Sequence, residues 1–147
     1  MDRDDLLQPS LAEHEGPKYR PFRLSSQVYV AFFGGALAVG GIGFLNAAML
    51  GMPNRARVAI VALALAAEGA LIAVVALTET DQGRLVSIVA GLVAFGGAYL
   101  LQRSPDRVYH FHTDDDEPYQ SLFGPGLIAC IAARVYEGVL VLGLLDQ

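Results

Sequence analysis

The amino-acid sequence predicts an all-α integral membrane protein, a four-transmembrane-helix bundle preceded by a polar N-terminal tail. Composition is the first observation. Hydrophobic residues make up 54% of the 147 residues and charged residues 17%, and the mean hydropathy is +0.44, whereas soluble domains carry about 25% charged residues. The second observation is that the apolar residues gather in blocks. Crossing roughly 30 Å of hydrocarbon takes about 20 residues of helix, and several blocks reach that length.

The polar tail covers residues 1–26, MDRDDLLQPSLAEHEGPKYRPFRLSS. It begins with acidic residues and lacks the apolar core of a secretory signal, so we expect no cleavage there. We expect its beginning to be disordered. Its end carries Lys18, Arg20 and Arg23 just before the first apolar block.

Four apolar blocks follow the tail and form a single domain, residues 27–147. The expected spans are about 27–51, 58–78, 85–102 and 122–145, with an acidic loop at 103–121. Blocks one and three have almost no polar residues, so they lack the polar stripe of a surface helix in a soluble protein. Runs of this length without period-2 alternation also exclude the strands of a membrane barrel.

The orientation of the four spans in the membrane is harder to predict from the sequence than their number. An even number of spans places both termini on one side, and the lysines and arginines near the membrane are equally numerous on the two sides. Because the first span often dominates orientation and its N-terminal flank is basic, we expect cytoplasmic termini in a plasma membrane and the acidic loop outside.

Charged residues interrupt two of the blocks. Glu68 stands in the middle of the second block, and Arg134 and Glu137 stand in the fourth. A central arginine costs about 2.5–3.5 kcal/mol on insertion scales, so we expect Arg134 to contact Glu68, and its i, i+3 spacing also permits Glu137. Asn46, near the end of block one, completes this intramembrane polar cluster through an expected interhelical hydrogen bond. The cluster is either a polar clasp that fixes helix pairing or a proton-linked or ligand-binding site.

The acidic loop contains a candidate metal site. Its ligands would be His110, His112, Asp114 and Asp116. In an extended segment His110 and His112 point the same way, and imidazole with carboxylate suits zinc, nickel or iron. No established metal-binding spacing is present, so a solvated acidic turn is the alternative. We expect no other cofactor, and Cys130, the single cysteine, provides neither a disulfide framework nor a thiolate site.

The sequence lacks the motifs of several function classes. There is no dense basic cluster for nucleic acid, and no nucleophile elbow, Walker loop or dinucleotide fingerprint. We therefore expect a non-enzymatic protein, an accessory, scaffold or regulatory subunit of a membrane assembly, with lipid, itself or another membrane protein as partner. The alternative is a small transporter or channel-like oligomer with Glu68, Arg134 and Glu137 at its polar centre.

The stretch from residue 21 to residue 57 has a recognisable pattern: a glutamine and aromatic entry, a Phe-Gly-Gly turn and an asparagine before a Leu-Gly exit. The residues that carry it are Gln27, Phe33, Gly34, Gly35, Asn46, Leu50 and Gly51. In this respect the chain resembles small bacterial multi-span membrane proteins of unknown function, although a proline often follows their double glycine where Ala36 stands here. The resemblance covers a quarter of the chain and implies a bacterial membrane protein without adding an activity.

Overall fold

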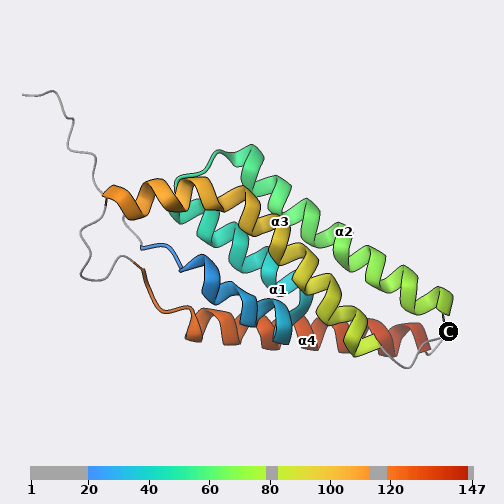
Figure 1. The fold of residues 1–147 in the computed structure, drawn as a ribbon. Helices are drawn as coiled ribbons and strands as arrows, with labels where there is room; N and C mark the ends of the chain where they lie inside the picture. The colour runs from blue at the N-terminus through green and yellow to red at the C-terminus, as the bar shows by residue number, and fades with distance from the viewer. Residues whose placement is uncertain (1–19, 79–82, 113–118, 146–147) are drawn as a thin grey trace, which may run out of the picture.

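The computed structural model describes residues 20–78, 83–112 and 119–145, with the backbone alone at 78, 112 and 140–145. The elements are a short 3-10 helix and four α-helices: η2 (Leu24–Ser26), α1 (Gln27–Met49), α2 (Asn54–Thr78), α3 (Gly83–His112) and α4 (Phe123–Leu145). They lie alongside one another in an elongated bundle (Figure 1). The prediction of an all-helical protein is confirmed.

Three helices are long and apolar enough to cross a membrane, which agrees with the prediction of a transmembrane helical bundle. They are Leu24–Met49, Asn54–Leu77 and Gly83–Phe111. Among the described residues α4 does not belong to this group. Length and composition alone thus select three candidate spans.

α1 does not run straight, because its backbone leaves the helical conformation at Gly35, with φ 72° and ψ −165°. In a straight helix residues 22 and 46 would lie about 36 Å apart, at 1.5 Å per residue. Instead the backbone N–H of Phe22 donates to Asn46 Oδ1 at 2.6 Å. α1 is therefore a hairpin of two half-helices, 27–34 and 36–49, with its tip at Gly35 inside the bundle and both ends at the same end of it (Figure 1).

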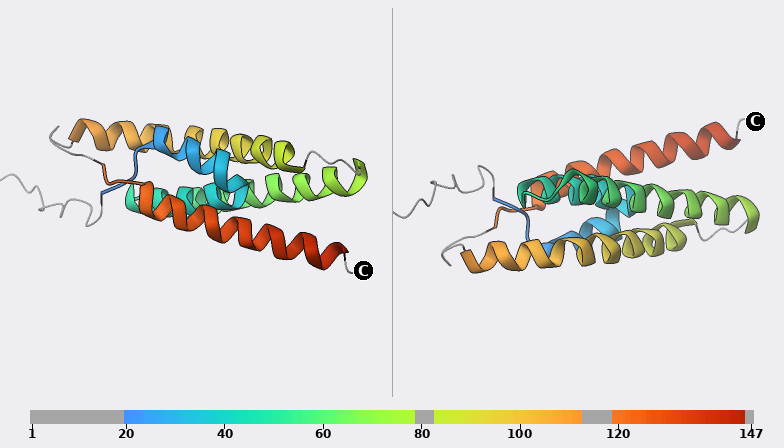
Figure 2. Two further views of the ribbon diagram at one scale, coloured as in Figure 1. Left: turned by 90° about the horizontal axis from the view of Figure 1, so that it is seen from below. Right: turned by 90° about the horizontal axis from the view of Figure 1, so that it is seen from above.

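This reversal changes the path of the rest of the chain. α2 runs away from the end that holds Phe22, which we call the N-terminal end of the bundle, α3 returns to it, and α4 runs away again (Figures 1 and 2). The start of the described chain at Arg20 and the end of α4 at Leu145 thus lie at opposite ends. Four straight helices would return the chain to the end where it started, but the reversal of α1 at Gly35 adds one change of direction. On which side of a membrane the termini lie stays a prediction.

The predicted tail and loop also differ from the structure. Residues 1–19 lie outside the described part, but Phe22 and Leu24 are only 2% and 4% exposed and belong to the fold. The backbone N–H of Gln120 donates to the Pro21 carbonyl at 3.1 Å, and Gln120 forms a β-bridge with Phe22. The chain therefore enters α4 at the N-terminal end of the bundle, and the acidic residues 113–118 lie outside the described part.

α3 continues past the predicted loop boundary at residue 102 and ends at His112, with Pro105 inside it. The predicted loop 103–121 is wrong for residues 103–112. Hydropathy falls after residue 102, but polar residues are compatible with helix formation. The extension is packed at its end, where the rings of Tyr109 and Tyr119 lie 5.9 Å apart.

α1 is the central helix of the bundle and packs against α2, α3 and α4, whereas among the described helices the backbone of α4 approaches that of α1 alone (Figure 2). Small residues make this packing close. A Cβ on Gly91 of α3 would clash with the Ala31 carbonyl oxygen, and a Cβ on Gly34 would meet Cys130 Sγ of α4 at 2.9 Å. Close backbone approach is how membrane helices gain van der Waals contact.

Candidate functional site

The tip of α1 places two helix ends in the interior of the bundle. The last carbonyl groups of the half-helix 27–34 and the first N–H groups of the half-helix 36–49 have no partners within their own half-helix. The helix dipole gives the first end a partial negative charge and the second a partial positive charge. Since the residues of α1 around Gly35 are apolar, the partners for this tip must come from other helices.

Arg134 of α4 supplies one such partner. Its Nε donates to the Phe33 carbonyl at 2.7 Å, and its Nη1 donates to Ser87 Oγ at 3.0 Å and to Glu137 Oε2 at 2.6 Å. The guanidinium therefore lies at the C-terminal end of the first half-helix, where a cation is favoured. It also connects α4 to α1 and to α3.

Glu137 also lies beside the tip. An ideal Cβ on Gly35 would lie 3.0 Å from Glu137 Oε1 and 3.1 Å from Ser87 Oγ. The carboxylate is thus beside the start of the second half-helix, where an anion is favoured. Its Oε1 is buried and has no hydrogen-bond partner among the described residues.

Glu68 of α2 is the third charged residue of this region, and 6% of it is exposed. It interacts electrostatically with Glu137 and Arg134, while its Oε2 is buried without a hydrogen-bond partner in the described part of the chain. The ion pair of Arg134 is made with Glu137. We name Glu68, Ser87, Arg134 and Glu137 the tip cluster.

Asn46 belongs to a different network, about 16 Å from Gly35 along the second half-helix at 1.5 Å per residue. Besides accepting the Phe22 N–H, it donates from Nδ2 to Gln102 Oε1 at 2.7 Å, and Gln102 Nε2 donates to the Gly43 carbonyl at 3.1 Å. The expected interhelical hydrogen bond of Asn46 is present, but Asn46 is not part of the tip cluster. This network links the chain before α1, at Phe22, to the second half-helix of α1 and to α3.

Gln102 was not predicted as a partner, although it is fully buried. The available signal is its position as the last residue of the third apolar block. A polar residue that closes an apolar block can stay in the buried layer when a second amide pairs with it. Asn46, at the end of the first block, is that second amide.

Most of the candidate metal site lies outside the described residues, namely Asp114, Asp116 and the side chain of His112. Positions 110 and 112 are helical, and i, i+2 positions differ by about 200° around a helix. They do not share a side as predicted for an extended segment. The His110 ring stacks on Tyr119, with centroids 6.3 Å apart. Within the described residues no group of three histidine, cysteine or acidic side chains could hold a metal ion.

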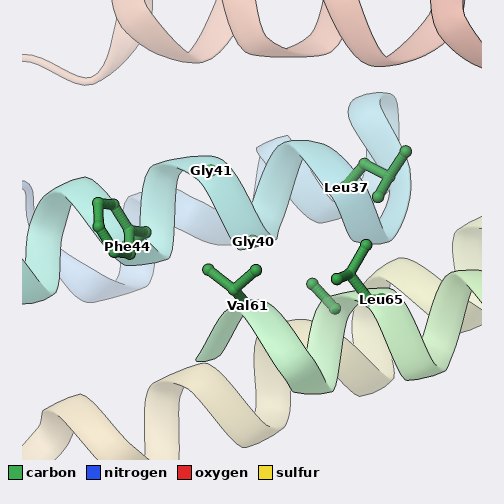
Figure 3. Close-up of a pocket in the computed structure, with 7 residues that line it drawn as sticks. Leu37, Gly40, Gly41, Phe44, Val61 and Leu65 are labelled. Carbon is green, nitrogen blue, oxygen red and sulfur yellow. The ribbon is translucent and has the colours of Figure 1, made fainter. Parts of the chain in front are cut away.

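A groove of about 280 Å³ lies between the second half-helix of α1 and α2 (Figure 3). The side chains that line it are apolar: Leu37, Gly40, Gly41, Phe44, Val61, Ala64 and Leu65. Such a lining suits a hydrocarbon chain and offers no polar group to orient a substrate. The chemistry of the described residues is therefore concentrated in the tip cluster.

Neither a protein-family model, nor a curated protein, nor a solved structure matches this chain. Function is therefore inferred from the tip cluster and from the surface around it.

Proposed function

We propose that the protein is a non-enzymatic multi-pass protein of a bacterial plasma membrane that serves as an accessory, scaffold or regulatory subunit of a membrane assembly. Arg134 carries this proposal. It lies in the middle of α4, yet its side chain is 35% exposed. Exposure of an arginine to lipid tails at that depth is costly. A neighbouring membrane helix that covered the side chain would remove this cost.

The surface around Arg134 suits such a neighbour. Ile131 and Gly138 lie about one turn before and after Arg134, and both are exposed. A Cβ on Gly138 would meet nothing within 4 Å, so a partner backbone can approach closely there. Among the described helices the backbone of α4 approaches only that of α1, and Arg134 reaches α3 through Ser87. The exposed surface at Ile131 and Gly138 is therefore open to a second copy or another membrane protein.

Native mass spectrometry of the full chain, extracted in a mild detergent or polymer nanodiscs, tests this proposal. We expect a complex of fixed stoichiometry. Gly138→Leu should dissociate it, whereas Gly69→Leu, at an exposed glycine of α2 that also has open space around it, should not. A single chain in extracts of native membranes and after purification would refute the proposal, as would identical behaviour of the two variants.

We further propose that the N-terminal end of the bundle is cytoplasmic and that the C-terminus is on the other side. The arginine distribution supports this orientation. With α1 folded back, Arg84 belongs to the first turn of α3, which begins at the opposite end. Six arginines belong to segments that begin or end at the N-terminal end: Arg20, Arg23, Arg55, Arg57, Arg103 and Arg107. Positively charged flanks favour the cytoplasm. A C-terminal alkaline phosphatase fusion should be active and a C-terminal green fluorescent protein fusion dark; the reverse result would contradict this orientation.

A small transporter or channel-like oligomer is the second candidate function. The broken α1 helix favours it, because discontinuous membrane helices often form ion and substrate sites in transporters. If Glu68 and Glu137 carry ions, purified protein in liposomes should dissipate a proton or Na⁺ gradient, and Glu68→Gln and Glu137→Gln should abolish the flux. No flux in the wild type, or unchanged flux in both variants, would remove this candidate.

A further inference from the structure

We propose that Glu68 and Glu137 hold one exchangeable monovalent cation, a proton or Na⁺, beside the tip of α1. This site does not depend on the proposed role as a subunit and does not require transport. The charge balance is the first reason. When ionised, Glu68 and Glu137 carry two negative charges against the single positive charge of Arg134, so one charge stays uncompensated. An uncompensated charge in a buried setting is strongly unfavourable.

The other groups around the carboxylates do not supply that charge. α3 contributes the neutral hydroxyl of Ser87, which already receives a hydrogen bond from Arg134. α4 contributes Arg134 and, one turn earlier, the buried thiol of Cys130, which faces the Val30 carbonyl at 4.0 Å. α1 contributes only backbone groups and apolar side chains near Gly35. A cation bound from outside would complete the balance.

Oxygen atoms without donors mark the place for this cation. Glu68 Oε2 and Glu137 Oε1 are both buried and lack hydrogen-bond partners among the described residues, and Glu68 is more than nine-tenths buried. Because Gly35 has no side chain, the position of its missing Cβ is within 3.0 Å of Glu137 Oε1 and 3.1 Å of Ser87 Oγ. The Glu137 carboxylate and the Ser87 hydroxyl thus lie beside the tip, and Glu68 adds a second buried carboxylate that interacts electrostatically with Glu137.

The chemistry of these ligands selects the cation. Carboxylate and hydroxyl oxygens are hard ligands, and a single positive charge neutralises the cluster, whereas a divalent ion would leave it with a net charge of +1. Transition-metal sites are built from at least three protein ligands, and the described residues offer no such group of histidine, cysteine or acidic side chains. A proton and Na⁺ satisfy both conditions.

One measurement tests for Na⁺. The purified full chain is heated in detergent at fixed pH, and unfolding is followed by the reaction of a fluorescent maleimide with Cys130, the only cysteine, which is 8% exposed. If Na⁺ binds, replacing choline chloride by NaCl at constant ionic strength should raise Tm along a one-site saturation curve. Glu68→Gln and Glu137→Gln should each abolish this rise, and either variant suffices if the other fails to fold. The matched control Asp106→Asn, in a partly buried carboxyl on α3 that also has an unpartnered oxygen, should retain it.

A second measurement tests for a proton. Dicyclohexylcarbodiimide modifies protonated carboxyl groups in apolar surroundings, and peptide mass spectrometry identifies the modified residue. Without Na⁺, we expect modification of Glu68 or Glu137 that declines as the pH rises. A Na⁺-dependent Tm assigns the site to Na⁺; carbodiimide modification without Na⁺ dependence assigns it to a proton. Absence of both effects in the wild type would overturn the proposal, as would a Na⁺ effect that persists in both glutamine variants. The mass of the assembly, which tests the subunit role, does not enter either measurement.

Discussion

The reversal of α1 at Gly35 should make this glycine difficult to replace. Its φ of 72° and ψ of −165° fall in a region that is essentially restricted to glycine, where other residues pay about 1–3 kcal/mol. An alanine Cβ would also lie 3.0 Å from Glu137 Oε1 and 3.1 Å from Ser87 Oγ. Overpacking of a tight interior costs typically about 1–3 kcal/mol, and these side chains can yield by a few tenths of an ångström, so the smaller part of that range applies.

Gly35→Ala should therefore lower the free energy of unfolding by about 3 kcal/mol, about a hundredfold in the equilibrium constant, since 1.4 kcal/mol is tenfold. Unfolding by sodium dodecyl sulfate in mixed micelles, followed by circular dichroism, measures this change. Gly41→Ala is the matched control in the same helix, because a Cβ there meets nothing within 4 Å. It should leave stability unchanged or raise it by up to about 1 kcal/mol through helix propensity.

If the Gly35→Ala and Gly41→Ala variants had the same free energy of unfolding, this reasoning would be refuted. That equality would mean that residue 35 is helical in the membrane and that α1 crosses as a straight span. Unequal stabilities in the expected order would support the hairpin. The control separates the special conformation at Gly35 from the general effect of adding a methyl group to α1.

Three further substitutions test the contacts of the tip and the outer end of α3. Arg134→Met should lower the free energy of unfolding by about 2 kcal/mol. This is less than the roughly 3–5 kcal/mol lost when one partner of a fully buried ion pair is removed, because a third of the Arg134 side chain is exposed. In a double-mutant cycle, adding Glu137→Gln should recover part of the loss. Gly91→Ala should destabilise by about 1–3 kcal/mol, since its Cβ clashes with the Ala31 carbonyl, measured by the same unfolding titration. Burial and the neighbouring Asp106 carboxyl raise the pKa of Tyr119 to about 12, so its contribution to stability, complete below pH 10, should be lost as the pH rises through 12; Tyr119→Phe should remove that dependence.

Each of these substitutions has an outcome that contradicts its premise. Equal losses for Arg134→Met with and without Glu137→Gln would show that the two residues are not coupled. Gly96→Ala is the control for Gly91→Ala, because its Cβ meets nothing within 4 Å, and equal effects of the two would argue against the close contact with α1. The difference in tyrosinate absorbance between the wild type and Tyr119→Phe isolates the titration of Tyr119, and a difference that appears near pH 10 would contradict the buried phenol.

Local sequence patterns were sufficient to predict the helices and the position of charged residues near the middle of two of them. Long apolar runs predicted four helices, and the i, i+3 spacing of Arg134 and Glu137 allowed the ion pair that the structure contains. Asn46 was correctly expected to hydrogen-bond another helix. These features depend on residues close in sequence or on the cost of leaving a polar group unpaired in an apolar layer, so they can be read along the chain.

The end of α3 was harder to predict. A drop in hydropathy after residue 102 suggested a loop. Hydropathy, however, indicates where a segment stops being apolar, and a helix can continue beyond that point. Pro105 lies inside this extension, and α3 continues through it to His112. Contacts with Tyr119, which follows the acidic segment, are a tertiary feature with no signature near residues 103–112.

The sequence by itself determined that this protein has apolar helices and that charged residues lie near the middle of two of them. Only the tertiary structure decided that the first block turns back at Gly35 and that Arg134, Ser87 and Glu137 surround this turn. The physical reason is the origin of the stabilising contacts. Composition measures the affinity of a segment for lipid but not its direction, and the groups that stabilise the open helix ends of α1 come from α3 and α4, more than 50 residues further along the chain. The same reversal places Arg20 and Leu145 at opposite ends of the bundle.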